Sequence, residues 1–243
     1  MTSHRPFSSS RTPSFAFGCV LMALTMLGTT SCAEEEDQAD TSAPAAAETA
    51  TDQGTQIAQA DAPAPEGPVY REMIFGDPNA PVTIVEYASL TCSHCATFHN
   101  SVLPELTEKY IDTGKVRLVF RDFPLNGLAM AGAMLARCAP GDRGKAMIKV
   151  MFGQQATWVQ SQSPIEPLTS YAKLAGMSED DVNACLENEN IMSAIREGQE
   201  TATNLYKIQA TPTLFIEDVK VEGARPFDYI AEIIEDKLAE KSS

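Results

Sequence analysis

Basic residues are scarce in this chain and form no cluster. The sequence has 18 Lys and Arg residues against 33 Asp and Glu, so its formal net charge is −15 at pH 7. Because a nucleic-acid-binding protein usually presents a basic patch or stripe, this shortage argues against a nucleic-acid partner. Internal repeats, coiled-coil heptads and a dimerisation arm are also missing. We therefore expect a monomer.

Apolar runs long enough to cross a membrane are missing too. The stretch Phe15–Leu27 has 13 residues, whereas a membrane-spanning helix needs about 20. Arg5 and Arg11 precede this stretch, and small residues follow it. This order is typical of an export signal, which we place at residues 1–32. Export implies a compartment in which disulfides persist.

The end of this signal fits two kinds of processing. Thr29-Thr30-Ser31-Cys32 resembles a relaxed lipobox, after which a lipidated Cys32 would become the mature N-terminus. Cleavage after Ala33 is the alternative. Residues 33–69 are rich in Ala, Pro and acidic residues, and Ile57 is the one large aliphatic residue up to Pro68. Such a stretch buries too little apolar surface to fold. We expect an acidic disordered tether, which holds a domain away from the membrane only if Cys32 is lipidated.

The most informative feature present is the motif Cys92-Ser93-His94-Cys95. It follows the β-branched run Val82–Tyr87 and opens a helical stretch. Two cysteines three apart in the first turn of a helix lie on one face, close enough for a disulfide. The N–H groups and the positive dipole end of that helix stabilise a thiolate on the first cysteine. This placement predicts a redox centre.

Residues 70–243 have the size of one domain. The elements expected in chain order are strands at 73–75 and 82–87, a helix at 92–110, a strand at 116–120, helices within 128–206, a hairpin at 213–216 and 219–221, and a helix at 227–241. The first strand–helix–strand unit predicts two parallel strands joined by a right-handed crossover.

Several motifs together resemble the DsbA-type family of bacterial disulfide oxidoreductases, in particular its alphaproteobacterial members. They are Phe75-Gly76-Asp77-Pro78, Ala80-Pro81-Val82, Glu86-Tyr87, Cys92-Ser93-His94-Cys95 and Ala210-Thr211-Pro212-Thr213. The resemblance implies an α/β thioredoxin fold with an inserted all-helical domain. Residues 70–123 would form its first half, 124–206 the helical insertion and 207–243 its second half.

This resemblance implies a periplasmic thiol oxidase that donates a disulfide to unfolded or reduced exported proteins. Cys92 would be the exposed nucleophile and Cys95 the shielded resolving cysteine, with the thiolate pKa about five units below that of a free cysteine. His94 would donate to the thiolate or add positive charge beside it. A membrane quinone-linked reoxidase of the DsbB type would be the partner. No cofactor beyond the Cys92–Cys95 disulfide is implied.

The resemblance also assigns roles to three residues outside the motif. Thr211-Pro212 resembles the family's cis-proline site, where an extended substrate peptide pairs with the backbone. Glu86 corresponds to a buried acid that relays protons to the resolving cysteine. A buried glutamate needs a partner, and we expect Arg117 or Arg121 in that place. The alternative for Glu86 is an exposed position on a strand.

Cys138 and Cys185 both fall in the expected helical insertion. Some members of the family carry a second, structural disulfide there, which implies that these two residues pair. Closing a loop of this length would stabilise the fold by about 4 kcal/mol. The alternative is two reduced cysteines in the core.

Two other functions remain open at this point. A reductase or isomerase on the same fold would need a lower reduction potential, and isomerases usually dimerise through an N-terminal domain where this chain has its tether. The second is a zinc- or copper-binding protein that uses Cys92, His94, Cys95 and His99. Oxidation of the cysteine pair competes with such metal binding.

Overall fold

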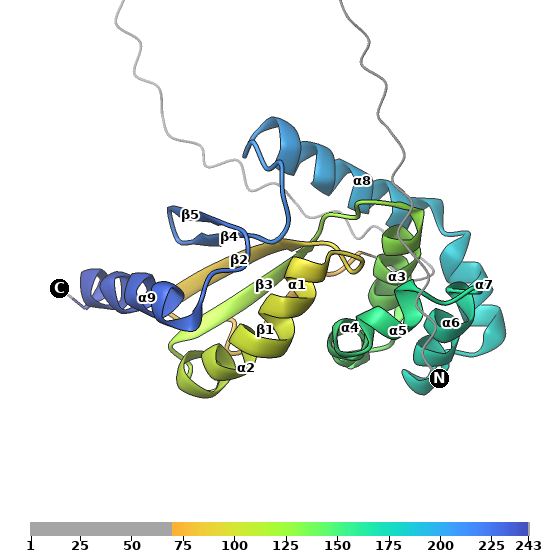
Figure 1. The fold of residues 1–243 in the computed structure, drawn as a ribbon, viewed down its shortest axis with the longest axis horizontal. Helices are drawn as coiled ribbons and strands as arrows, with labels where there is room; N and C mark the ends of the chain where they lie inside the picture. The colour runs from red at the N-terminus through yellow and green to blue at the C-terminus, as the bar shows by residue number, and fades with distance from the viewer. Residues whose placement is uncertain (1–69, 243) are drawn as a thin grey trace, which may run out of the picture. The chain divides into compact units, whose positions relative to one another are not determined.

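The computed structural model describes residues 70–242. The expected export signal, Cys32 and the tether lie outside these residues. A five-stranded sheet organises the described part of the chain (Figure 1). Its strands are β1 (Met73–Phe75), β2 (Val82–Ala88), β3 (Val116–Asp122), β4 (Thr213–Ile216) and β5 (Val219–Glu222).

The order of these strands is β1-β3-β2-β4-β5, so β2 is central. Strands β2 and β3 are parallel, as the strand–helix–strand unit predicts, and the other neighbours are antiparallel. The hairpin expected at 213–216 and 219–221 is confirmed, with β5 one residue longer. This arrangement is the thioredoxin fold that the motifs implied.

A helical segment occupies the region 92–110, as expected, but it is not a regular α-helix throughout. It consists of α1 (Ser93–Thr97), the π-helical turn η1 (Phe98–Val102), α2 (Leu103–Leu106) and a second π-helical turn η2 (Thr107–Ile111). Pro104 lies at the start of α2. Because proline has no N–H to donate, it interrupts the regular pattern of hydrogen bonds, and π turns are a usual way to accommodate such a defect.

Six helices separate β3 from β4. They are α3 (Gly127–Cys138), α4 (Arg143–Gly153), α5 (Gln155–Val159), α6 (Ile165–Leu174), α7 (Glu179–Leu186) and α8 (Glu189–Asn204). Figure 1 shows α3–α7 gathered to one side of the sheet. Ser178 is the N-cap of α7, and its hydroxyl accepts from the N–H of Asp181 in a capping box.

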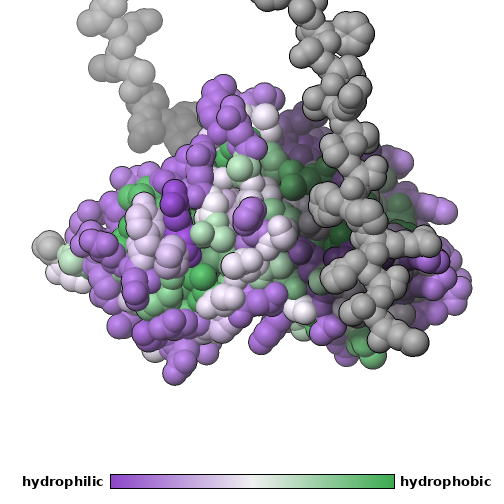
Figure 2. Space-filling model, in the orientation of Figure 1, coloured by the Kyte–Doolittle hydropathy of each residue, from purple (hydrophilic) through white to green (hydrophobic). Residues whose placement is uncertain are grey.

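Two main cores hold the fold together, and one of them includes the cysteine motif. One lies between the sheet and the helices of both thioredoxin halves, where Ile84 and Phe98 pack with Ile230 of α9 (Phe227–Lys241). The other fills the helical insertion around Trp158 and extends to Cys95. Polar side chains dominate the margins of the face drawn in Figure 2. Among the described helices, none combines the length and the apolar character that crossing a membrane requires.

Candidate active site

The cysteine motif lies where β2 ends and α1 begins. Cys92 is the N-cap of α1, with an extended backbone (φ −82°, ψ 121°), and the first turn of the helix contains no acidic residue. Cys92 is half-buried and Cys95 is fully buried; both are free thiols in this structure. The accessible cysteine therefore precedes the shielded one, at the positive end of the helix dipole.

The pKa of Cys92 is lowered from 9.0 to about 5. The largest cause is a hydrogen bond from the Cys95 side chain, followed among the lowering effects by one from Thr211. The backbone N–H groups of Cys95 and His94 also donate to the sulfur, and desolvation of Cys92 opposes all of these. At pH 7 the thiolate of Cys92 thus outnumbers its thiol by about a hundredfold. The pKa of Cys92 thus lies far below that of a free cysteine, in the direction that the resemblance implied.

The pKa of Cys95 is raised well above its ordinary value. Burial is the main cause, followed by the hydrogen bond to Cys92 and by the negative charge of Glu86. The two thiols therefore differ strongly: Cys92 carries the negative charge and Cys95 keeps its proton.

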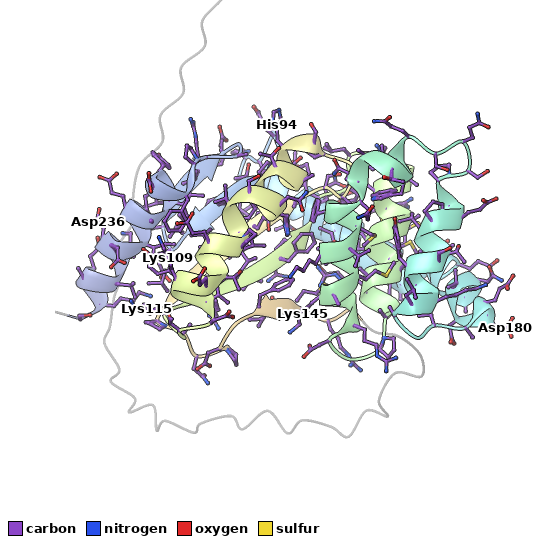
Figure 3. The ribbon with its side chains drawn as sticks, turned by 60° about the horizontal axis from the view of Figure 1, so that its bottom comes forward. His94, Lys109, Lys115, Lys145, Asp180 and Asp236 are labelled. Atoms are coloured by element: carbon purple, nitrogen blue, oxygen red, sulfur yellow. A yellow bond between two sulfur atoms is a disulfide. The ribbon has the colours of Figure 1, made fainter. Side chains whose placement is uncertain are left out.

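His94 acts on the sulfur through its backbone. Its N–H is among the groups that lower the pKa of Cys92. The ring is exposed, and Figure 3 shows it at the outer end of α1. The sequence analysis assigned the effect to the imidazole, whereas the described hydrogen bonds to Cys92 involve the main chain of His94.

The loop before β4 faces the motif. The Thr211–Pro212 peptide bond is cis. In its thiol form Cys92 donates from Sγ to the Thr211 carbonyl oxygen, at 3.2 Å. The Thr211 hydroxyl is buried, and it alone among the buried side-chain N and O atoms of residues 70–242 has no hydrogen-bond partner while Cys92 is a thiol. A hydrogen bond from this side chain to the Cys92 thiolate is among the effects that lower the pKa of Cys92.

Glu86 is buried, as the resemblance implied, but its partner is not an arginine. Nε2 of His99 lies 3.0 Å from both carboxylate oxygens. Arg117 instead donates to the Thr83 hydroxyl, at 2.9 Å, and Arg121 pairs with Glu72. The expectation of Arg117 or Arg121 is therefore wrong. Glu86 is paired in register with Phe120 of β3, whereas Arg117 and Arg121 are odd-numbered steps away along that strand. Because successive side chains of a strand point to opposite faces, both arginines lie on the face of the sheet opposite to the buried carboxylate.

The ring of His99 is enclosed by aromatic side chains. It stacks on Phe152 of α4 with centroids 4.0 Å apart, and it meets Phe98 and Phe120 edge-on. His99 thus faces Glu86 rather than the cysteines. In residues 70–242 no three His, Cys, Asp or Glu side chains come together as metal ligands. The arrangement gives no support to the zinc or copper alternative.

Gln155 is a site residue that the sequence analysis missed. It begins α5 in the helical insertion, and its side-chain amide donates to the carbonyl oxygens of Leu90 at 2.8 Å and Cys92 at 2.9 Å. No sequence motif marks it, because it lies more than 60 residues from its partners. Within α5, the only sign that Gln155 has a role is that a polar residue occupies a buried position.

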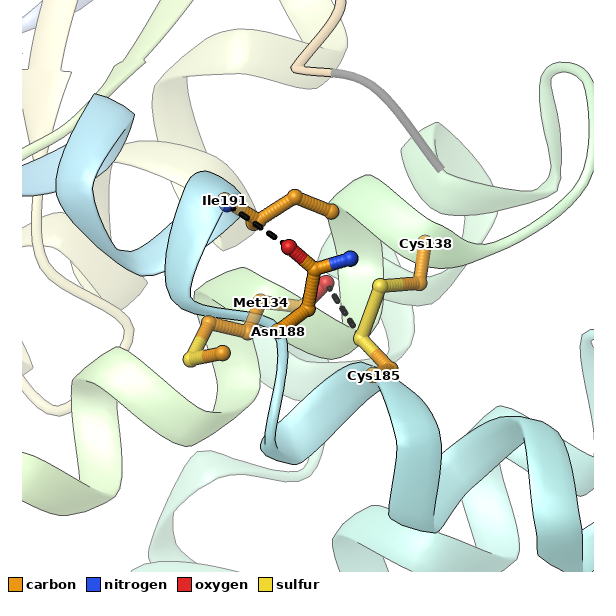
Figure 4. The surroundings of a disulfide bond; sticks show 5 residues. All are labelled: Met134, Cys138, Cys185, Asn188 and Ile191. Atoms are coloured by element: carbon orange, nitrogen blue, oxygen red, sulfur yellow. Dashed lines mark hydrogen bonds between the residues drawn. A yellow bond between two sulfur atoms is a disulfide. The ribbon is translucent and has the colours of Figure 1, made fainter. Parts of the chain in front are cut away.

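Cys138 at the end of α3 and Cys185 in α7 form a disulfide (Figure 4). Sγ of Cys185 also lies 3.2 Å from the carbonyl oxygen of Met134. Cys185 is buried in the core of the helical insertion, and Cys138 is partly buried against that core. The bridge therefore ties two helices of the insertion together.

Comparison with known proteins agrees with this geometry. The family model described as Thioredoxin matches residues 69–236. A Rickettsia conorii relative, provisionally named a protein-disulfide oxidoreductase, is 32% identical over 172 residues, covering 70% of this chain and 61% of its own length. Disulfide bond formation protein D of Bacillus subtilis is 26% identical over 176 residues, covering 69% of this chain and 78% of that protein. The chain spans 59% to 61% of the length of the Rickettsia bellii and Rickettsia conorii relatives that it matches.

Solved structures show the same similarity. The crystal structure of Wolbachia pipientis alpha-DsbA1 superposes with a TM-score of 0.66 and 32% identity, covering 72% of this chain and 95% of that one. Oxidised BdbD from Bacillus subtilis gives a TM-score of 0.62 at 24% identity, over 68% of this chain and 92% of that chain, which bears on the fold alone.

Proposed function

This chain belongs to the thioredoxin family, within its DsbA-type disulfide oxidoreductases, and we propose that it is a thiol oxidase that donates the Cys92–Cys95 disulfide to exported proteins. The observation that carries the proposal is the position of the half-buried Cys92 at the N-cap of α1, where its Sγ lies 3.2 Å from the Thr211 carbonyl oxygen and the surrounding hydrogen bonds lower its pKa to about 5. A stabilised thiolate favours the reduced form of the pair. Its disulfide is therefore readily passed to another protein.

The proposed reaction has two thiol–disulfide exchanges. A client thiolate attacks Sγ of Cys92, the Cys92–Cys95 bond breaks, and Cys95 leaves and takes up a proton. A second client thiolate then attacks the client sulfur of this mixed disulfide and releases Cys92 as a thiolate. The client has lost two electrons and gained a disulfide, and the enzyme pair has gained the two electrons.

Protonation of Cys95 is the step to which Glu86 contributes in this proposal. A thiol with a strongly raised pKa is a poor leaving group unless it receives a proton as the bond breaks. In the buried Glu86–His99 pair, Nε2 of the imidazole lies at hydrogen-bond distance from the carboxylate, 3.0 Å away. We assign this pair the exchange of a proton with Cys95, with the Glu86 carboxylate acting directly and His99 acting through it.

Exposed apolar side chains near the motif suit an unfolded client. Leu125 and Tyr206 are about half exposed. The N–H of Leu125 donates to Ser89 Oγ at 3.3 Å, and the ring of Tyr206 contacts Tyr87 at the end of β2. Exposed apolar surface of this kind favours binding of unfolded chains. An extended segment would pair with the backbone beside Thr211 and Pro212.

The partner and location follow from this chemistry. Each turnover leaves the cysteine pair reduced, so an external oxidant must restore it. A membrane quinone-linked reoxidase of the DsbB type is the proposed partner, with the periplasm as the location and a lipidated Cys32 as the proposed membrane anchor.

The redox equilibrium of the pair with glutathione tests the proposal. Purified protein is equilibrated over a range of glutathione ratios, its free thiols are trapped, and the mass shift gives the fraction reduced. A Cys92→Ala variant, which cannot form the pair, is the control. We expect a potential near about −120 mV, as for an oxidant, whereas one near about −270 mV would indicate a reductase and overturn the proposal.

A further inference from the structure

The helical insertion reaches the cysteine motif through one buried side chain. Gln155 is buried at the start of α5. Its Nε2 lies 2.8 Å from the carbonyl oxygen of Leu90 and 2.9 Å from that of Cys92. A glutamine amide nitrogen carries two hydrogens, and each of them is used here. The contact joins two parts of the chain more than 60 residues apart.

The carbonyl of Cys92 also begins α1. It accepts the first hydrogen bond of the helix, from the N–H of Ala96, at 3.1 Å. Gln155 therefore holds an oxygen that belongs to the N-cap of that helix. The turn before it has one further bond, from the N–H of Cys92 to the carbonyl oxygen of Ser89 at 3.0 Å. The side-chain amide of Gln155 therefore donates hydrogen bonds to the carbonyl oxygens of the two residues on either side of Thr91.

The orientation of this backbone decides what the Cys92 sulfur meets. The N–H groups of His94 and Cys95 lower the pKa of Cys92 because the extended N-cap directs its side chain back over the first turn. A rotation of the Cys92 peptide plane moves the sulfur relative to these donors. Two hydrogen bonds to the carbonyls on either side of Thr91 oppose such a rotation.

We propose that Gln155 is a positioning residue for the Cys92 thiolate: by fixing the Leu90 and Cys92 carbonyls it keeps the sulfur over the helix N–H groups, and so makes the cysteine pair more oxidising. This inference deepens the proposed oxidase function and rests on it. The helical insertion then tunes the redox centre as well as covering it.

The test compares Gln155→Met with Gln154→Met. Methionine has nearly the shape of glutamine but no N–H donors, and Gln154 is an exposed neighbour whose side chain makes no hydrogen bond in the described structure. The pKa of Cys92 is read from the ultraviolet absorbance of its thiolate across a pH titration. For Gln155→Met we expect this pKa to rise by about one unit and the equilibrium constant with glutathione to change about tenfold toward the disulfide form. Gln154→Met should match the wild type.

Comparing the two redox states separates positioning from simple stabilisation. The free energy of unfolding is measured in urea for oxidised and reduced Gln155→Met. We expect a larger loss in the reduced state, because only that state carries the thiolate. An equal loss in both states with an unchanged pKa of Cys92 would overturn the inference.

A measurement on the wild type covers the case in which Gln155→Met does not fold. The side-chain amide hydrogens of Gln155 should exchange with solvent much more slowly in the reduced protein than those of the exposed Gln154 and Gln160. Exchange as fast as at those positions would overturn the inference.

The inference and the function can fail separately. A wild-type potential typical of a reductase would remove the oxidase proposal, while the difference between Gln155→Met and the wild type would still measure the effect of Gln155. An oxidising wild-type potential that Gln155→Met leaves unchanged would remove only the role of Gln155.

Discussion

Nε2 of His99 lies 3.0 Å from each carboxylate oxygen of Glu86, and both side chains are almost completely shielded from solvent. The negative charge of Glu86 is one of the causes that raise the pKa of the Cys95 thiol. A carboxylate in this position is tolerated because the imidazole satisfies it. The pair is therefore both a structural unit and the proposed proton source.

Removing only one member of this pair is expected to be costly. His99→Phe keeps the stacking with Phe152 but leaves Glu86 buried without a partner. We expect it to lower the free energy of unfolding by about 3 kcal/mol, and Glu86→Leu combined with His99→Phe to recover most of that loss. Urea denaturation of the two single variants and the double variant measures the coupling. His94→Phe, at an exposed histidine, should change stability by less than about 0.5 kcal/mol. Additive effects at Glu86 and His99 would contradict the prediction.

The Thr211 hydroxyl should matter only when Cys92 is ionised. Thr211→Val removes a donor to the thiolate, and we expect the pKa of Cys92 to rise from about 5 by about one unit. Below the pKa of Cys92 the variant should be at least as stable as the wild type, because the lost hydroxyl has no other partner. A pH titration of thiolate absorbance and urea unfolding in acid measure the two effects.

Thr213→Val is the matched control for this prediction. The Thr213 hydroxyl is buried at the start of β4, two residues after Thr211, and donates to the carbonyl oxygen of Ala210, at 2.8 Å. The same substitution there should cost about 1 kcal/mol and leave the pKa of Cys92 in place. Equal behaviour of the two variants would show that the Thr211 hydroxyl has no special relation to the sulfur.

The reduced protein should gain stability over the oxidised protein as pH rises. The pKa of Cys92 is about 5 in the folded chain and near 9 when unfolded. A depressed folded pKa stabilises the fold fully above the unfolded value, and this contribution is lost as pH falls through the folded value. Thermal unfolding of both redox forms, measured between about pH 5 and 8, tests this prediction. In this pH range Cys95 does not ionise in the unfolded chain.

Titrating groups that both redox forms share affect the two melting temperatures alike, so their effects cancel when one melting temperature is subtracted from the other. The difference should therefore report the cysteines. Reduced Cys92→Ala provides the control, because it lacks the titrating thiol and should show no such rise relative to the oxidised wild type. A difference that stays constant with pH would contradict a thiolate at Cys92.

Local patterns in the sequence were enough to predict the strands and the motif position. The β-branched run at 82–87 and the helix start after Cys92 are short-range features, and each lies where it was expected. The partner of Glu86 is a different kind of feature. His99 reaches it only because the helix packs on the sheet, so the pairing depends on a contact between elements rather than on spacing in either one.

Gln155 illustrates the same limit more strongly. Its two partners belong to a loop over 60 residues earlier, and they are backbone carbonyls with no side-chain signature. Hydrogen bonds of this kind leave no pattern in the sequence of either segment. The π turns at η1 and η2 were also missed, since helical periodicity averages over such local widening.

The Cys138–Cys185 disulfide should stabilise the fold without setting the chemistry of Cys92. It closes a loop with a sequence separation of 47, and its Cys185 end is buried in the core of the helical insertion. We expect Cys138→Ala combined with Cys185→Ala to lower the free energy of unfolding by about 4 kcal/mol, because the unfolded chain regains the entropy of the open loop. Urea denaturation of the oxidised proteins measures this loss.

The pKa of Cys92 distinguishes this structural role from a redox role. None of the groups that set this pKa belongs to the bridge, since they come from Cys95, His94 and Thr211. The thiolate titration of the variant with both cysteines replaced should therefore match that of the wild type as long as the variant is folded. A shift in the pKa of Cys92 would mean that the bridge acts on the motif through the helical insertion. Gln155 is the contact through which we would then look for the effect, because it joins α5 directly to the Cys92 backbone.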